Sequence, residues 1–221
     1  MLRCSGTTVP DAYQQVQWST VVVQGIDKHI CGILANHTLV CWAQRDYDVF
    51  GQINVPASLT WSTVSVGAFH TCGITTIQGK LYCFGADWDG QISVPADVTE
   101  AAWSHVSAGR AHTCGILRDD GTLRCWGYSD FATVPDALKN AVWSDVSVGN
   151  WHTCGILNGT QALHCFGPNA YGEATVPTDV GDSAWSTVSA GDGWTCGILA
   201  GSGVMRCFGL DYWDRFPVPD P

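Results

Sequence analysis

The sequence predicts an all-β fold, a β-propeller, on three observations. A stretch that begins W-S-x-V and ends C-F or C-W recurs along the 221 residues. Within each copy, short segments alternate apolar and polar residues as strands do, and no copy shows the period of a helix. The leading tryptophans are 43, 42, 40 and 42 residues apart, a spacing typical of propeller blades. They are Trp18, Trp61, Trp103, Trp143 and Trp185.

The second repeat shows the three strands that we expect in each unit. Residues 61–66 alternate as a half-buried strand, and Gly67 ends it, since glycine permits a tight turn or a close backbone approach. Residues 70–74 alternate again, residues 75–80 form a hairpin loop, and residues 81–84 form the third strand. A loop with polar and aromatic residues and then a Val-Pro pair follow. Because proline lacks an N–H, the pair indicates an edge strand or a strand end.

The repeats predict one domain over residues 1–221, because no linker or charge run divides the chain. Residues 2–6 match 123–127, so we expect the chain to begin halfway through a repeat. It would then be a piece of a larger propeller, or its surplus strand would be used between molecules. The expected units are about 18–60, 61–102, 103–142, 143–184 and 185–221, with a partial repeat at 1–17.

Ten of the eleven cysteines fall as one pair in each repeat, four pairs separated by 11 residues and the first by 10. If the hairpin loop is centred between them, the two members face each other on adjacent strands, close enough for a disulfide. Reduced cysteines that fill a small core position are the alternative. The spacing does not fit a zinc site. The expected disulfides are Cys31–Cys41, Cys72–Cys83, Cys114–Cys125, Cys154–Cys165 and Cys196–Cys207.

Cys4 aligns with the second member of such a pair and has no first member in the chain. We therefore expect it to be unpaired or bonded to another molecule or segment. Asn36 and Asn158 begin N-x-T sequons in the loops between paired cysteines, so we expect both to carry glycans. Disulfides and sequons together favour a secretory route to the cell surface or beyond, although the first residues do not resemble a signal peptide.

The composition argues against several classes of function. The formal net charge is −10, which makes a nucleic-acid partner unexpected. No apolar run is long enough to enter and span a membrane. No nucleophile elbow, zinc-protease, phosphate-loop or paired-carboxylate motif is present, so we expect a protein that is not an enzyme and has no catalytic residue, metal or cofactor.

The motifs V-S-V-G-A-F-H-T, L-Y-C-F-G and Gly90-Gln91-Ile92 resemble the regulator of chromosome condensation repeat, over nearly the whole chain. The cysteine pairs resemble the variant of this repeat in the crinkly ectodomains of plant receptor-like kinases. The resemblance implies a propeller that presents a surface. A guanine-nucleotide exchange role, known in the family, would need a reducing compartment, which the cysteines oppose. We expect an extracellular interaction or structural assembly module, with a protein partner or self-assembly, and a carbohydrate-binding propeller as the alternative.

One set of equivalent positions lies two residues before the first cysteine of each pair. Repeat symmetry would place these side chains in a ring, where they could form a rim that faces a metal or a ligand. The resemblance implies instead that each imidazole bonds a neighbouring backbone group. The residues are His29, His70, His112, His152 and Trp194.

The loops after the third strands carry aromatic residues beside carboxylates or amides. An exposed aromatic face between hydrogen-bond acceptors suits a sugar ring, and repetition would give several sites. The alternative is that these aromatic residues pack between blades or contact a protein. The candidate ligand residues are Tyr47, Trp88, Tyr128, Tyr171 and Trp213.

Overall fold

The structure, a computed structural model, describes residues 9–23, 29–43 and 48–210. They form five antiparallel sheets of three strands, each in chain order, which confirms the predicted propeller blades. We call the sheets blade 1 to blade 5. The strands are β1 (Trp18–Val23), β2 (His29–Leu34) and β3 (Leu39–Ala43) in blade 1; β4 (Trp61–Val66), β5 (His70–Thr75) and β6 (Leu81–Gly85) in blade 2; β7 (Trp103–Ala108), β8 (His112–Leu117) and β9 (Leu123–Gly127) in blade 3; β10 (Trp143–Val148), β11 (Thr153–Leu157) and β12 (Leu163–Phe166) in blade 4; and β13 (Trp185–Ala190), β14 (Trp194–Leu199) and β15 (Met205–Gly209) in blade 5.

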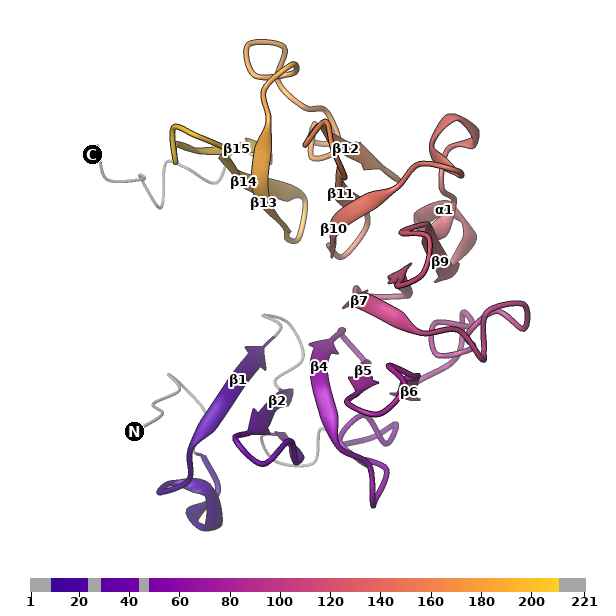
Figure 1. The fold of residues 1–221 in the computed structure, drawn as a ribbon, viewed down its shortest axis with the longest axis vertical. Coiled ribbons are helices and arrows are strands. Elements are labelled where there is room, and N and C mark those ends of the chain that lie inside the picture. Colours follow the sequence, from indigo (N-terminus) through magenta and orange to yellow (C-terminus); the bar gives the residue numbers. More distant parts are fainter. Residues whose placement is uncertain (1–8, 24–28, 44–47, 211–221) are drawn as a thin grey trace.

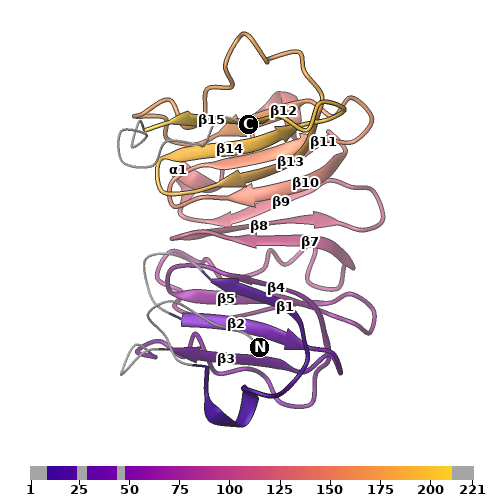
Figure 2. The same cartoon turned by 90° about the vertical axis from the view of Figure 1, so that its left-hand side faces the viewer.

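The five blades follow one another around an arc, and blades 1 and 5 stand apart on either side of its open part (Figure 1). Viewed from that open side, the strands run across the picture between two ends of the molecule (Figure 2). We call one the hairpin end, formed by residues 35–38, 76–80, 118–122, 158–162 and 200–204. The other is the loop end, formed by the turns at 67–69, 109–111, 149–151 and 191–193 and the loops at 48–54, 86–93, 128–133 and 168–175.

Blades 2 to 5 each begin against the hairpin of the blade before them. The Trp103 N–H donates to the carbonyl of Gly79 over 2.9 Å, and the Trp143 N–H donates to that of Gly121 over 2.8 Å. The tryptophan is followed by a one-residue shift in register, which leaves Trp103 and Val106 in the same buried cluster. The indole then lies over Gly115 of the next strand, where an added Cβ would come within 2.6 Å of the ring. The W-S-x-V pattern therefore encodes a bulged first strand that packs on a glycine.

The hydrophobic core lies between blades rather than within one sheet. Between blades 2 and 3, Cys72, Ile74 and Leu81 pack against Trp103 and Val106. Corresponding clusters fill the spaces between the other consecutive blades. Blades 2, 3 and 4 therefore each supply half of two interfaces, as expected for a repeat that cannot bury its apolar face alone.

In blades 2, 3 and 4, the first turn approaches the next blade closely. The Ala68 N–H donates to the carbonyl of Gly109 over 3.0 Å. A Cβ added to Gly67 would lie 2.4 Å from that oxygen, so this glycine allows the close backbone approach. From the sequence, Gly67 could serve either a tight turn or a close backbone approach. The structure shows that it serves the close approach to the Gly109 carbonyl.

One local expectation was wrong. The described Val-Pro pairs are not in strands; they lie on irregular segments that cross from the loop end to the hairpin end, with valines such as Val94 packed on the core. Short helical turns also occur, namely η1 (Asp11–Tyr13), α1 (Ser129–Ala132) and η2 (Asp136–Leu138). Turn α1 replaces the loop of the other blades because the segment from Gly127 to Val134 is two residues shorter than that from Gly85 to Val94.

Candidate functional site

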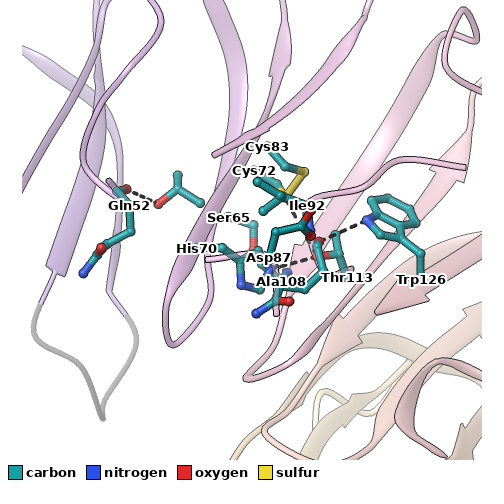
Figure 3. Close-up of a disulfide and its surroundings, with 12 residues drawn as sticks. Gln52, Ser65, His70, Cys72, Cys83, Asp87, Ile92, Ala108, Thr113 and Trp126 are labelled. Atoms are coloured by element: carbon teal, nitrogen blue, oxygen red, sulfur yellow. Dashed lines mark hydrogen bonds between the residues drawn. A yellow bond between two sulfur atoms is a disulfide. The ribbon is translucent and has the colours of Figure 1, made fainter. Parts of the chain in front are cut away.

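The equivalent histidines lie between blades and are buried, so they do not form an exposed rim. His70 and Thr113 belong to consecutive blades, and Nε2 of the histidine lies 2.8 Å from the threonine Oγ1 (Figure 3). The same pair recurs as His29–Thr71 at 3.0 Å, His112–Thr153 at 2.9 Å and His152–Thr195 at 2.7 Å. The expected partner was a backbone group. The observed partner is a side chain of the next blade, about 42 residues away.

The threonine fixes which nitrogen of the imidazole carries the proton. Thr113 Oγ1 donates to the carbonyl of Gln91 over 2.8 Å, so it accepts a hydrogen bond from His70 Nε2–H. The other nitrogen, Nδ1, is then unprotonated and lies beside Gly67. Burial lowers the pKa of His70 and of His112 to about 3, and that of His29 and of His152 to about 4. These imidazoles are therefore neutral links between blades.

A metal role finds no support in the described part of the chain. In residues 9–23, 29–43 and 48–210, no three His, Cys, Asp or Glu side chains gather as possible metal ligands. The fifth position, Trp194, is partly exposed on blade 5 and packs against Gly191.

Each blade also contains the disulfide that its cysteine spacing predicts. In blade 2, Cys72 pairs directly with Cys83 across β5 and β6, and the bond lies in the core beside the His70–Thr113 link (Figure 3). The other four bonds are Cys31–Cys41, Cys114–Cys125, Cys154–Cys165 and Cys196–Cys207. They are structural cross-links. Cys4 lies outside the described residues.

The loop end carries the exposed aromatic side chains Phe50, Trp88, Tyr128 and Tyr171. Phe50, Phe69 and Trp88 form one cluster from three segments, with ring centroids 4.4 Å apart for Phe50–Trp88 and 5.5 Å for Phe69–Trp88. Trp88 remains 60% exposed and Phe50 36%. The structure thus joins a predicted residue, Trp88, to Phe50, which sequence reasoning missed because the previous blade contributes it.

The loop that carries Trp88 is fixed from within. The Asp87 carboxylate accepts hydrogen bonds from the Ile92 N–H at 3.0 Å and from the Ser93 hydroxyl at 2.7 Å. Buried Gln91 accepts a hydrogen bond from the Asp89 N–H through Oε1 at 2.9 Å. The recurring Asp/Asn and Gly-Gln/Glu positions are therefore a loop frame that holds the intervening aromatic residue outward.

A second group at the loop end combines an aromatic ring with both charges. The Arg110 guanidinium lies over the ring of Trp151, 4.6 Å from its centroid. The Trp151 indole N–H donates to the Asp192 carboxylate over 3.0 Å. Phe131, in the turn α1, packs edge-on against Trp151 with its centroid 5.4 Å away. This group connects blades 3, 4 and 5.

Of the other predicted ligand residues, two lie at the loop end and two lie outside the described residues. Tyr128 is 41% exposed and packs on buried Phe131, with ring centroids 4.6 Å apart. Tyr171 is exposed at the loop end of blade 4. Tyr47 and Trp213 lie outside the described residues. Asn36 and Asn158 are exposed at the hairpin end, away from the aromatic residues.

Comparison with known proteins identifies the repeat and the fold. A family model described as the Regulator of chromosome condensation (RCC1) repeat matches residues 61–91 and 103–132, in blades 2 and 3. The entire ectodomain of the Physcomitrella patens receptor kinase CR4 is similar, with 22% identity and a TM-score of 0.76 over 93% of this chain and 57% of that one.

Two further solved structures share the fold. The CRINKLY WD40 ectodomain of the Arabidopsis thaliana receptor kinase ACR4 has 22% identity and a TM-score of 0.64, over 84% of this chain and 62% of that one. Human WBSCR16 has 15% identity and a TM-score of 0.69, over 91% of this chain and 64% of that one. The chain spans about three fifths of the length of these structures.

Proposed function

We propose that this propeller, whose blades 2 and 3 match the RCC1 repeat, is a non-catalytic extracellular module that binds a protein partner. The loop end is the proposed binding surface. The Phe50–Phe69–Trp88 cluster carries this proposal. A group of aromatic side chains from neighbouring blades, open to solvent and surrounded by polar residues, has the composition of an interface hot spot.

The extracellular placement rests on chemistry and on likeness. Five disulfides persist only where the surroundings are oxidising. Two of the similar structures are receptor-kinase ectodomains. Glycans on Asn36 and Asn158 would project from the hairpin end and leave the loop end accessible. No described helix has the length and apolarity needed to cross a membrane.

A carbohydrate ligand is the second candidate, because Trp88 is an exposed ring between two carboxylates. Both oxygens of Asp87, however, already accept hydrogen bonds within the loop. Asp87 therefore has fewer lone pairs left for sugar hydroxyls than Asp89. The protein-binding proposal is therefore the stronger of the two.

The test compares two exposed apolar side chains at opposite ends. Trp88→Ala removes the centre of the aromatic cluster, and Ile77→Ala changes a side chain at the hairpin end that is 73% exposed. Binding is measured against a panel of purified ectodomains and against a glycan array. We expect an ectodomain to bind, with affinity reduced at least tenfold by Trp88→Ala and unchanged by Ile77→Ala. Equal loss with both variants would contradict the loop-end proposal, and Trp88-dependent glycan binding alone would favour the lectin.

A further inference from the structure

The loop end differs from the hairpin end in charge as well as in aromatic content. The described segments of the loop end contain six carboxylates and one cationic side chain. Those of the hairpin end contain two of each, namely Asp119 and Asp120 and the cations Lys80 and Arg118. The loop-end charges are Asp48, Asp87, Asp89, Asp130, Glu173 and Asp192 against Arg110. Except for Glu173, these carboxylates lie on exposed or half-buried residues, so the surface around the aromatic clusters carries negative charge.

The Trp151 group shows how this surface accommodates an indole and a cation together. The Arg110 guanidinium covers the Trp151 ring, and the Asp192 carboxylate accepts the indole N–H. The cation interacts with the electron-rich face of the ring, and the nearby carboxylate adds a favourable charge. All three side chains come from successive blades, so the arrangement depends on the fold and not on one loop.

Trp88 also lies among aromatic rings and carboxylates, and no cation of the described residues covers its ring. It packs on Phe50 and Phe69, and it is preceded by Asp87 and followed by Asp89. Within the described residues, the ion pairs are Lys80–Glu100 and Lys139–Asp136, so no described lysine or arginine pairs with either aspartate. The loop frame fixes the position of the indole before any partner binds, which reduces the entropy lost on binding.

We propose that Trp88 and Asp89 form a binding site for a basic segment of a protein partner, with an arginine or lysine side chain over the indole and its charge near Asp89. This inference rests on the proposed protein-binding function and specifies the chemistry of the partner. Arginine fits best, because its planar guanidinium stacks on an aromatic ring and donates to a carboxylate at the same time. The acidic loop end would also speed the approach of such a segment at low ionic strength.

The test uses the full chain and two synthetic probes. One is a twelve-residue peptide of alternating arginine and glycine, and the other has glutamate in place of arginine. Binding is followed by the NMR signal of the Trp88 indole N–H, which is assigned by its loss in Trp88→Ala. We expect the arginine peptide to shift this signal with millimolar affinity, and the glutamate peptide to leave it unchanged.

Two charge variants separate a local site from general attraction. Asp89→Asn should weaken the arginine peptide about twofold to fivefold, as expected for one exposed ion pair. Asp119→Asn, at the hairpin end, should leave the affinity unchanged, and raising the salt to about 1 M should abolish most of the binding. No shift of the indole signal at about 10 mM peptide, or equal effects of the two variants, would overturn the proposal.

The outcome is distinguishable from failure of the proposed function. If an ectodomain binds in a Trp88-dependent manner but its affinity is insensitive to salt and to Asp89→Asn, the protein-binding function stands and the basic partner is wrong. A shift of the Trp88 signal by a neutral saccharide and not by the arginine peptide would refute the basic partner and support the carbohydrate alternative.

Discussion

His70 Nε2–H of blade 2 donates a hydrogen bond to Thr113 Oγ1 of blade 3 over 2.8 Å, and the same pair joins each described blade to the next. We expect Thr113→Val to lower the free energy of unfolding by about 1–3 kcal/mol, because it leaves a buried N–H without an acceptor at nearly constant volume. Urea denaturation measures the change. Thr113→Ser should retain most of the stability, and Thr187→Val, at an exposed position of β13, serves as the matched control. Equal stability of Thr113→Val and the native chain would contradict the structural role of the link.

The buried histidines predict that acid destabilises the protein well above the range in which carboxylates titrate. Their pKa values in the folded state are about 3 to 4, whereas an unfolded histidine has a pKa near 6.5. Between these values the unfolded chain binds more protons, so the stability is complete above pH 6.5 and falls as the pH decreases toward 4.

Urea midpoints measured at pH 7.5, 6.5 and 5.5 test this expectation. His112→Gln should be less stable at pH 7.5 and should lose less further stability on acidification than the native chain. His105→Gln, at an exposed strand position, should follow the native profile. A native midpoint that does not change over this range would show that the buried imidazoles do not contribute.

The sequence predicted the blades well because the information for them is local and repeated. Alternation within residues 61–66 and 70–74 gives the strands, and the cysteine spacing gives the register of the second and third strands. Thr113 escaped notice as the partner of His70 because the two are 43 residues apart and meet only when consecutive blades stack. The turn at Ser129–Ala132 was missed because the segment that contains it is only two residues shorter than in other repeats, a small difference in a repeat of about 42 residues.

The candidate site was harder to predict for the same physical reason. Trp88 is recognisable within its own loop, but its cluster needs Phe50 from the preceding blade and Phe69 from the first turn of its own. The histidines looked like possible ligands because a repeated polar position resembles a ring of donors. Their burial against a threonine and a glycine shows that they are structural and not ligand-binding. This burial depends on the next blade, so the sequence of one repeat does not predict it.

Exposure predicts the order in which the disulfides are reduced. Cys196 of blade 5 is half-buried, whereas the equivalent cysteines of blades 1 to 4 are fully buried under the following blade. The same blade leaves Ile198 37% exposed, against 1% for Ile74 in blade 2. We expect Cys196–Cys207 to be reduced first under mild thiol treatment, as followed by stepwise alkylation and peptide mapping. Simultaneous reduction of all five, or earlier labelling of Cys72, would contradict this order.

Removal of an internal disulfide should cost more than removal of the exposed one. The Cys72→Ala, Cys83→Ala double variant opens an 11-residue separation and leaves a gap in the core between blades 2 and 3. We expect it to lose about 2–4 kcal/mol of unfolding free energy in urea. The matched Cys196→Ala, Cys207→Ala variant opens a loop of the same length but should lose less stability, because Cys196 is half-buried. Equal losses would show that loop closure alone determines the contribution, and the reverse order would contradict the prediction.

Glu173 occupies the position at which two other loops have glutamine, and the difference predicts a stabilising substitution. Its carboxylate accepts a hydrogen bond from the Tyr171 N–H over 2.7 Å, as Gln91 Oε1 accepts one from the Asp89 N–H. Both side chains are buried, but only Glu173 brings a charge, and no lysine or arginine in the described residues pairs with it. Burying an unpaired charge is costly, and glutamine keeps the acceptor oxygen. We therefore expect Glu173→Gln to raise the unfolding free energy at pH 7 by about 1 kcal/mol.

The reciprocal substitution is the control for this prediction. Gln91→Glu introduces the same charge into the matched loop of blade 2 and should destabilise the protein by a similar amount. Urea midpoints of both variants and of the native chain, measured in one buffer, decide the sign. A loss of stability with Glu173→Gln would mean that the stronger hydrogen bond of the carboxylate outweighs the cost of its burial. The loop of blade 4 would then depend on the charge that distinguishes it from the other two.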